Sequence, residues 1–248
     1  MRVIARLDIK GQNVVKTVRT EGLRVVGDPK VLARKYYEGG IDELMYIDIV
    51  ASLYQRNLDF ELLKSVSENI FIPMTVGGGI RSLHDIALAL RAGADKVAIN
   101  TFAVSHPEFL KEAAQKFGSQ CIVLSIEAKK TPQGSWEVYT DGGRERTGVD
   151  VVAWAKKAIE LGVGEILLTS VDVDGTRDGY DIALIKAVAA ISPVPVIAHG
   201  GAAGAEDMLK AREAGAAAVS ASSIFHYNVT TIGAVKETLH EAGVPIRI

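Results

Sequence analysis

The stretch IPMTVGGGIRSLHDIALALRAGADKVAIN, residues 72–100, contains one complete strand–helix–strand unit. An apolar run at 72–76 stops at three glycines, a helical pattern follows, and a second apolar run occupies 95–100. Continuous apolar runs are typical of parallel strands that helices cover on both faces. Ser82 and Asp85 resemble a capping box at the start of the helical pattern, which ends in a glycine, the usual C-cap. The stretch therefore predicts one β/α unit.

The same unit recurs along the whole chain. Eight apolar runs alternate with helical patterns, at 3–9, 43–49, 72–76, 95–100, 121–127, 165–170, 195–200 and 217–222. Eight evenly spaced units in 248 residues predict a TIM barrel, the (β/α)8 class of α/β fold. An open, doubly wound sheet is the alternative, but it does not need eight units of such even spacing. No linker interrupts the pattern, so we expect a single domain over 1–248.

The two halves of the chain resemble each other. Gly93 in RAGADKV and Gly215 in EAGAAAV are 122 positions apart, and LDIK recurs as IEAK 119 positions later. A period near half the length indicates an internal duplication of four β/α units. We expect half-barrels at roughly 1–120 and 121–248, related by a pseudo-twofold axis.

The composition excludes several classes of protein. Hydrophobic residues make up 48% and charged residues 23%, and the net charge of −2 predicts neither a nucleic-acid partner nor an anionic membrane surface. Cys121 is the only cysteine, so no internal disulfide can form, and its apolar run predicts that it is buried. The start, MRVIARLDIK, is no signal peptide, and no apolar stretch reaches the ~18 residues of a membrane span. We expect a cytoplasmic protein.

Glycine-rich turns follow the third and seventh predicted strands, as TVGGGIRS and IAHGGAAG. Glycine lets the backbone approach a ligand closely, and the loops after strands 7 and 8 of a TIM barrel often bind phosphate. The expected phosphate-binding residues are Gly78, Gly79, Asn100 and Thr101 in the first half, and Gly200, Gly201, Ser222 and Ser223 in the second. Two such sites predict a long substrate with a phosphate at each end. The alternative is that these glycines only form tight turns.

Carboxylates lie where the predicted strands end. Asp8 closes the first strand and Glu127 closes its equivalent in the second half. Charged residues at the carboxyl ends of barrel strands are typical of catalysis, and two facing carboxylates suit general acid–base chemistry. Asp48, Asp172 and Asp174 belong to the same rim, and His199 is the one histidine at a strand end. No spacing indicates a metal site, and we expect no cofactor.

Nearly the whole chain resembles the cyclase subunit of imidazole glycerol phosphate synthase, the HisF family. The resemblance rests on IPMTVGGGIRS, RAGADKVAIN, WEVYTDGGRERTG, GEILLTSVDVDGTRDGYD, HGGAAG and IFHY. It implies a TIM barrel and a partner glutaminase of the HisH kind that releases ammonia, which passes through the barrel to its mouth. There, ammonia would convert a bisphosphorylated ribulosyl aminoimidazole carboxamide compound into imidazole glycerol phosphate and an aminoimidazole carboxamide ribotide.

The resemblance also implies roles for individual residues. Asp8 matches a catalytic carboxylate, Lys16 a lysine that contacts the substrate, and Asp95 a residue that faces the glutaminase. We also expect Asp48 to contact the substrate. One phosphate site matches Gly79, Asn100 and Thr101, and the other matches Asp174, Gly175, Gly201, Ser222 and Ser223. A charged ring where ammonia enters matches Arg2, Glu43, Lys96 and Glu165.

Two positions depart from the family pattern. Glu127 stands where the family usually has aspartate, and Arg6 where it usually has a small residue. Arg6 and Asp8 point to the same side of a strand, so Arg6 should lie inside the barrel. The nearest candidate partners are Asp8, Asp48 and Glu127, and we expect Arg6 to pair with Glu127, which would hold that carboxylate ionised, or with Asp48. These departures favour an alternative, a HisF-like subunit that delivers ammonia to a nucleotide sugar in surface-polysaccharide synthesis; a HisA-like isomerase is a third alternative that no residue favours.

Overall fold

The computed structural model describes residues 1–248, and its eight parallel strands close into a barrel. These strands are β1 (Arg2–Lys10), β4 (Glu43–Asp48), β5 (Met74–Gly77), β6 (Lys96–Ile99), β7 (Ile122–Lys130), β10 (Glu165–Ser170), β11 (Val196–His199) and β12 (Ala218–Ala221). Each pairs in parallel with the next, β7 pairs with β10, and β12 pairs with β1. The predicted TIM barrel and its eight strands are confirmed, and the open-sheet alternative is wrong.

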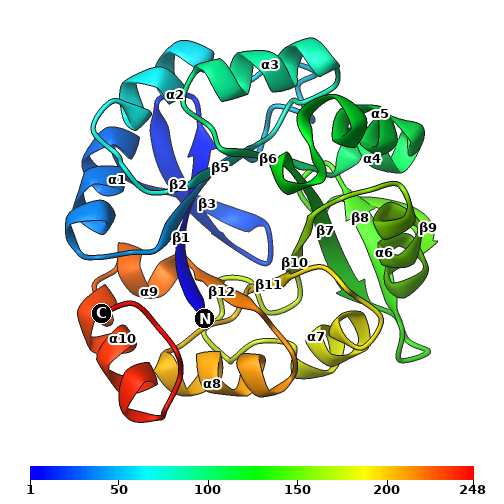
Figure 1. Ribbon diagram of the computed structural model, residues 1–248. Coiled ribbons are helices and arrows are strands. Elements are labelled where there is room, and N and C mark those ends of the chain that lie inside the picture. Colours follow the sequence, from blue (N-terminus) through cyan, green and yellow to red (C-terminus); the bar gives the residue numbers. More distant parts are fainter.

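Helices surround the barrel on all sides (Figure 1). They are α1 (Pro29–Glu38), α2 (Phe60–Ser67), α3 (Leu83–Arg91), α4 (Thr101–Ser105), α5 (Glu108–Phe117), α6 (Val151–Glu160), α7 (Ile182–Ala189), α8 (Ala205–Glu213), α9 (Ser223–His226) and α10 (Ile232–Glu241), with a 3-10 turn η1 (Ser119–Cys121). None of them has the length and hydrophobicity that crossing a bilayer requires. Cys121 is half-buried, so the expectation of a buried cysteine is wrong. It lies at the end of η1 and not in the buried strand β7, which begins one residue later.

The helix caps repeat in the two halves. Asp28 and Asp59 cap α1 and α2, and Asp150 and Asp181, each 122 positions later, cap α6 and α7. Each carboxylate accepts a hydrogen bond from a backbone N–H at 2.9 or 3.0 Å. N-cap side chains of this kind satisfy backbone donors that the helix itself leaves unpaired. Equivalent helices in the two halves therefore begin with the same kind of N-cap, an aspartate.

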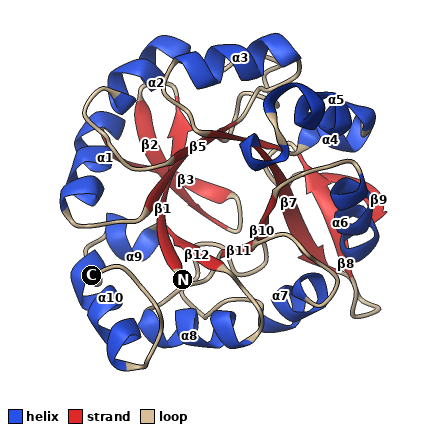
Figure 2. Ribbon diagram, viewed as in Figure 1, coloured by secondary structure: helices blue, strands red, loops and turns tan.

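Two antiparallel hairpins extend the barrel wall, and the sequence analysis missed them. One is β2 (Asn13–Val18) with β3 (Glu21–Gly27), which pairs with β1, and the other is β8 (Trp136–Thr140) with β9 (Glu145–Asp150), which pairs with β7 (Figure 2). They follow equivalent strands, so the repeat includes the hairpins. Turn residues at Gly11, Gly22 and Gly134 lie beside runs rich in β-branched residues and could have revealed them.

Alternate residues of each strand point into the barrel and form layers. A charged layer lies at the amino ends of the strands, and an apolar layer lies above it. The apolar layer consists of Ile4, Met45, Ala98, Val123, Leu167, Ile197 and Ala218. By the same alternation, Arg6 and Thr169 belong to the next layer, and Asp8 and Glu127 to the layer at the mouth. The chemistry-bearing residues are therefore separated from the charged layer by an apolar one.

Candidate active site

Two pairs of loops lie on opposite sides of the barrel mouth. The first loop pair follows β5 and β6, and the second loop pair follows β11 and β12, four strands further around the barrel. The structure gathers the predicted Gly78, Gly79, Asn100 and Thr101 around one pocket. It gathers Asp174, Gly175, Gly200, Gly201, Ser222 and Ser223 around another.

The glycines of these turns are required by packing. Gly78 and Gly79 have φ of 95° and 72°, and Gly200 and Gly201 have φ of 95° and 94°. A Cβ at Gly78 would lie 2.2 Å from a backbone oxygen of Asp48, and one at Gly201 would lie 2.0 Å from a backbone oxygen. Tight turns alone therefore explain the glycines, and the argument for phosphate has to rest on the residues around them.

The first loop pair borders an open pocket of about 310 Å³. Its wall includes Asp48, Arg81, Asn100 and Glu127, so cationic, neutral and acidic groups all face the same space. Asn100 donates from Nδ2 to Glu127 Oε2 (3.1 Å), while its Oδ1 is buried without a partner. A buried, unpaired polar atom costs free energy, which a bound ligand or water would recover.

The second loop pair borders a space of only about 10 Å³. Lys16, from β2, lines it, and its Nζ lies 2.7 Å from Asp174 Oδ2 and 3.0 Å from Oδ1. The hydroxyl of Ser222 beside this space is buried without a partner. The structure therefore brings a buried lysine and an unpaired hydroxyl to the loops where the sequence predicts the second phosphate.

The hairpin β2–β3 packs against the loop after β10, beside the second loop pair. The backbone N–H of Arg19 donates to Asp174 O, and its Nε donates to Asp172 O, both at 2.8 Å. A Cβ at Gly175 would lie 2.4 Å from Thr17 O, so only glycine permits this approach. Arg19 itself has a φ of 51°, which is unfavourable for a residue with a side chain.

Asp8 lies between the loop pairs and is paired with two cations. Its Oδ1 accepts from Arg6 Nε at 2.7 Å, and its Oδ2 lies 3.6 Å from Lys16 Nζ; all three side chains are buried. Burial favours the neutral acid, but Arg6 and Lys16 outweigh it and hold the pKa of Asp8 well below its usual range. Asp8 is therefore an anion at every physiological pH.

Glu127 faces Asp8 from the opposite strand of the barrel and has neutral partners. Its Oε2 accepts hydrogen bonds from Gly143 N (2.7 Å) and from Asn100 Nδ2 (3.1 Å). Burial raises the pKa of Glu127 to about 7, and the more distant charge of Arg6 only partly opposes this. The two carboxylates of the mouth thus differ in protonation at neutral pH.

Arg6 does not pair as the sequence analysis expected. It contacts Asp8, with Thr169 Oγ1 3.4 Å from its Nη1, and neither Glu127 nor Asp48 is its partner. Asp48 is one residue beyond Ile47, the inward-facing residue of β4, so it points away from the barrel interior. The expectation that Arg6 would hold Glu127 ionised is also wrong, because Asp8, two residues away, is within direct reach.

Asp48 lies in the open pocket, where Arg56 Nη2 contacts its Oδ2 at 2.7 Å. Burial raises the pKa of Asp48 in spite of this ion pair. Asp172 accepts from the backbone N–H of Lys130 (2.7 Å), a contact between the loop after β10 and the end of β7. His199 is buried, with Nδ1 3.1 Å from Ser220 Oγ, and burial together with the Arg6 charge lowers its pKa to about 3. His199 is therefore neutral.

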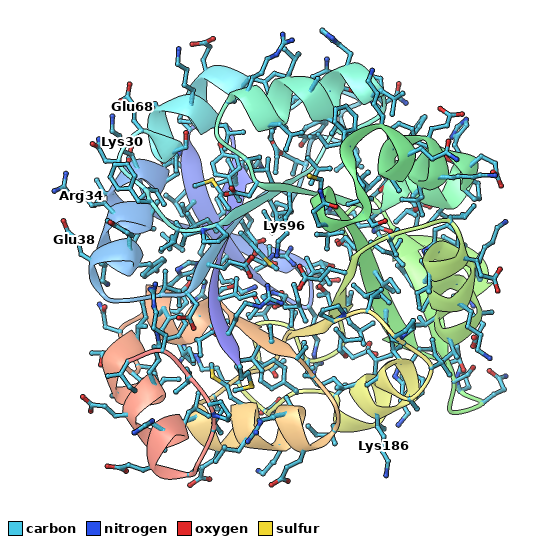
Figure 3. The ribbon with its side chains drawn as sticks, in the orientation of Figure 1. Lys30, Arg34, Glu38, Glu68, Lys96 and Lys186 are labelled. Carbon is cyan, nitrogen blue, oxygen red and sulfur yellow. The ribbon has the colours of Figure 1, made fainter.

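The predicted charged ring forms at the other end of the barrel. Lys96 Nζ lies 2.6 Å from Glu43 Oε1 and 2.8 Å from Glu165 Oε2, and Arg2 contacts the same two carboxylates. Figure 3 shows Lys96 at the centre of the barrel. Asp95 is not part of the ring; it is exposed on the same rim and accepts from Met74 N at 2.8 Å.

Several pocket residues were missed by the sequence analysis. Arg56 pairs with Asp48, Arg81 lines the open pocket, and Thr169 contacts Arg6. Gly143, in the turn of the second hairpin, donates to Glu127. The turn signal TDGGR could have placed Gly143 in a hairpin, but the pairings depend on loop conformations that no spacing indicates.

Comparisons with known proteins agree on one family. A family model described as "Histidine biosynthesis protein" matches residues 2–231. The chain is 59% identical to the imidazole glycerol phosphate synthase subunit HisF of Legionella pneumophila over 81% of this chain and 95% of that protein. It is 50% identical to the subunit HisF of Streptomyces avermitilis (100% and 98% covered) and 47% identical to that of Streptococcus mutans (99% and 98% covered).

Proposed function

We propose that this chain, which belongs to the HisF family of imidazole glycerol phosphate synthase subunits, is the cyclase subunit of that enzyme and acts in histidine biosynthesis. The chain would use ammonia to convert a bisphosphorylated ribulosyl aminoimidazole carboxamide compound into imidazole glycerol phosphate and an aminoimidazole carboxamide ribotide. This makes it a lyase, and its role in amino-acid biosynthesis suits the cytoplasm.

The observation that carries this proposal is the arrangement of the mouth. Two equivalent loop pairs lie on opposite sides of the barrel, and Asp8 and Glu127 lie on the strands between them. A substrate with a phosphate at each end can occupy both loop pairs only if its middle crosses the two carboxylates. Lys16, buried beside the second loop pair, supplies positive charge for the phosphate there.

The two carboxylates would have different roles in this reaction. Glu127, with a pKa of about 7, can hold a proton and release it under the conditions in which the enzyme works. Asp8 supplies a fixed negative charge opposite it. Two carboxylates in different environments can divide catalytic roles in this way. Asp48 and Lys16 are proposed to contact the substrate, and no metal or cofactor is part of the proposal.

The partner would bind at the other end of the barrel. Arg2, Glu43, Lys96 and Glu165 form a closed ring of ion pairs there, and Asp95 is exposed beside them. The amino ends of barrel strands are not where catalysis occurs. A glutaminase of the HisH kind that docks on this rim would release ammonia directly at the ring, so we propose a heterodimer.

The test supplies the bisphosphorylated substrate with an ammonium salt and follows imidazole glycerol phosphate. Turnover with ammonia, and with glutamine once the cognate glutaminase is added, is expected. A folded protein that forms no product with either nitrogen source would overturn the cyclase assignment.

The ammonia-delivery alternative makes a different prediction in the same test. It requires that the chain stimulates the glutaminase but does not cyclise the substrate. The isomerase alternative has no support in the three relatives described above, each of which is named as a HisF subunit.

A further inference from the structure

The charged groups of the mouth divide into two sets. Arg6, Asp8, Lys16 and Asp174 form a continuous chain of ion pairs, at 2.7 Å for Arg6–Asp8, 3.6 Å for Asp8–Lys16 and 2.7 Å for Lys16–Asp174. Glu127 is outside this chain, because its hydrogen bonds come from a side-chain amide and a backbone N–H. The division arises because both cations, Arg6 and Lys16, contact Asp8 and neither contacts Glu127.

Arg6 is positioned to form an ion pair with Asp8. Its Nε donates to Asp8 Oδ1, Thr169 Oγ1 lies 3.4 Å from its Nη1, and the apolar layer of the barrel lies beneath it. A guanidinium cannot lose its proton, so Arg6 keeps its charge at every pH at which the protein is folded. With Lys16 at the other oxygen, each oxygen of Asp8 faces a cation.

Several charged groups face Glu127 from the elements around it, and none makes an ion pair with it. Arg6 and Asp8 face it from β1, and Asp141 lies on the turn of the hairpin β8–β9. Arg144 and Asp174 line the same small cavity of about 30 Å³ as Glu127. The acidic and basic groups are mixed, so no single neighbour fixes the charge of Glu127 as Arg6 fixes that of Asp8.

We propose that Arg6 is a positioning residue that fixes Asp8 as a permanent anion and leaves Glu127 as the one carboxyl of the mouth that exchanges a proton with the substrate. The proposal rests on the cyclase function proposed above. When ammonia adds to the ribulosyl carbonyl, the nitrogen forms the new bond to carbon, the π bond of the carbonyl breaks, and the oxygen, which receives that electron pair, takes the proton of Glu127. The added nitrogen then returns one proton to Glu127, which ends in its starting state.

The first experiment reads protonation directly and needs no turnover. Carbon-13 carboxyl signals are titrated in the full-length protein, with Asp8→Asn and Glu127→Gln used to assign them. In the wild type, Glu127 titrates with a midpoint of about 7, and Asp8 does not titrate in the range where the protein is folded. Arg6→Met brings the titration of Asp8 into that range, and Arg6→Lys, which keeps a positive charge, does not.

The matched control is Arg34→Met. Arg34 is an exposed arginine on α1 that pairs with Glu38 at 2.8 Å, on the outside of the ring of helices (Figure 3). This variant must leave both titrations unchanged. If Arg6→Met does not fold, Arg6→Gln replaces it and retains hydrogen-bond donors without charge. An Asp8 signal that is the same in the wild type and the uncharged variants, or a Glu127 that does not titrate near neutral pH, overturns the proposal.

The second experiment is the pH dependence of turnover with ammonia. In the wild type and in Arg6→Lys, the turnover rate depends on one ionisation near pH 7. In Arg6→Met the rate depends on a second ionisation as well, since Asp8 then also exchanges a proton. Unchanged profiles in all three proteins contradict the proposal. If no protein turns over but the carboxyl titrations are as expected, the cyclase function fails and the positioning role of Arg6 stands.

Discussion

The two loop pairs have the same backbone plan but border spaces of different size. The first borders a space of about 310 Å³, whereas the second borders about 10 Å³ and is lined by the ion pair of Lys16 and Asp174. In the repeat, the position of Lys16 corresponds to Thr140, and that of Asp174 corresponds to Ser52. The duplication therefore preserves turns and caps, while a few side chains on hairpins and loops leave a larger pocket in one half and a buried lysine–aspartate pair in the other.

The largest effect is expected from Glu127→Gln on the open side. The amide keeps the size and some hydrogen bonds of the side chain but cannot carry the proton. Turnover with ammonia should fall roughly 100- to 10,000-fold, the usual contribution of a positioned acid or base. Steady-state kinetics at saturating substrate measure it, with Glu127→Asp, which keeps the carboxyl group, as the control that retains turnover. Full activity of Glu127→Gln would remove Glu127 from the mechanism.

Stability should depend on pH in opposite senses for the two carboxylates. The pKa of Glu127 is raised in the folded state to about 7. Its contribution to the free energy of unfolding is therefore complete at a pH below the pKa of Glu127 in the unfolded chain, and it is lost as the pH rises to about 7. The pKa of Asp8 is lowered in the folded state. Asp8 therefore stabilises the fold at a pH above the pKa it has in the unfolded chain, and this stabilisation is lost in acid.

The difference between wild type and Glu127→Gln isolates the first of these effects. Urea unfolding measures the free energy of unfolding at about pH 5 and about pH 8. Between these two pH values the wild type should lose about 1–3 kcal/mol more than the variant, because solvent in the open pocket reduces the effect that the whole pKa shift would have. An equal change in both proteins would mean that Glu127 is not the group that titrates.

The two turns should differ in their tolerance of a side chain. A Cβ at Gly201 would meet a backbone oxygen at 2.0 Å, and one at Gly79 would meet a backbone oxygen at 2.7 Å. Both positions have positive φ, so each alanine costs about 1–3 kcal/mol of backbone strain, and the closer contact adds to this for Gly201→Ala. Denaturant unfolding of the two variants measures the difference. Equal losses would indicate that both turns relax freely.

The smallest effect is expected from Lys16→Met. Loss of one charge-assisted contact should weaken phosphate at the second loop pair by roughly 10-fold, without affecting the first. Phosphate titrations followed by NMR signals from Ser223 and Thr101 report on the two sites separately. Thr140→Val, at the corresponding position of the other half, is the control and should leave the second site unchanged. A similar loss at both sites would mean that Lys16 acts on the fold rather than on the anion.

Much of the fold could be predicted because repeating patterns specify it. The eight strands follow from apolar runs, and Ser82 caps α3 as its spacing with Asp85 indicates. The hairpins were missed, since their short strands carry no continuous apolar run. The partner of Arg6 was also missed, because strand direction places Arg6 inside the barrel but does not say which carboxylate its guanidinium reaches.

The candidate site could be predicted in part for the same reason. Residues at strand ends gather at one mouth by topology alone, which is why both loop pairs and both carboxylates were found. The state of each group depends on contacts from loops and hairpins. Lys16 pairs with Asp174 beside the second loop pair and Arg56 pairs with Asp48, and neither contact follows from a strand pattern.

The central claim is that each loop pair binds one phosphate of a single long substrate. A crystal soaked at high inorganic phosphate concentration tests it most directly. The account predicts phosphate density beside Gly79 and Thr101 and a second phosphate beside Gly201 and Ser223, with Lys16 turned toward it. A soaked crystal that shows phosphate at neither place would contradict the account.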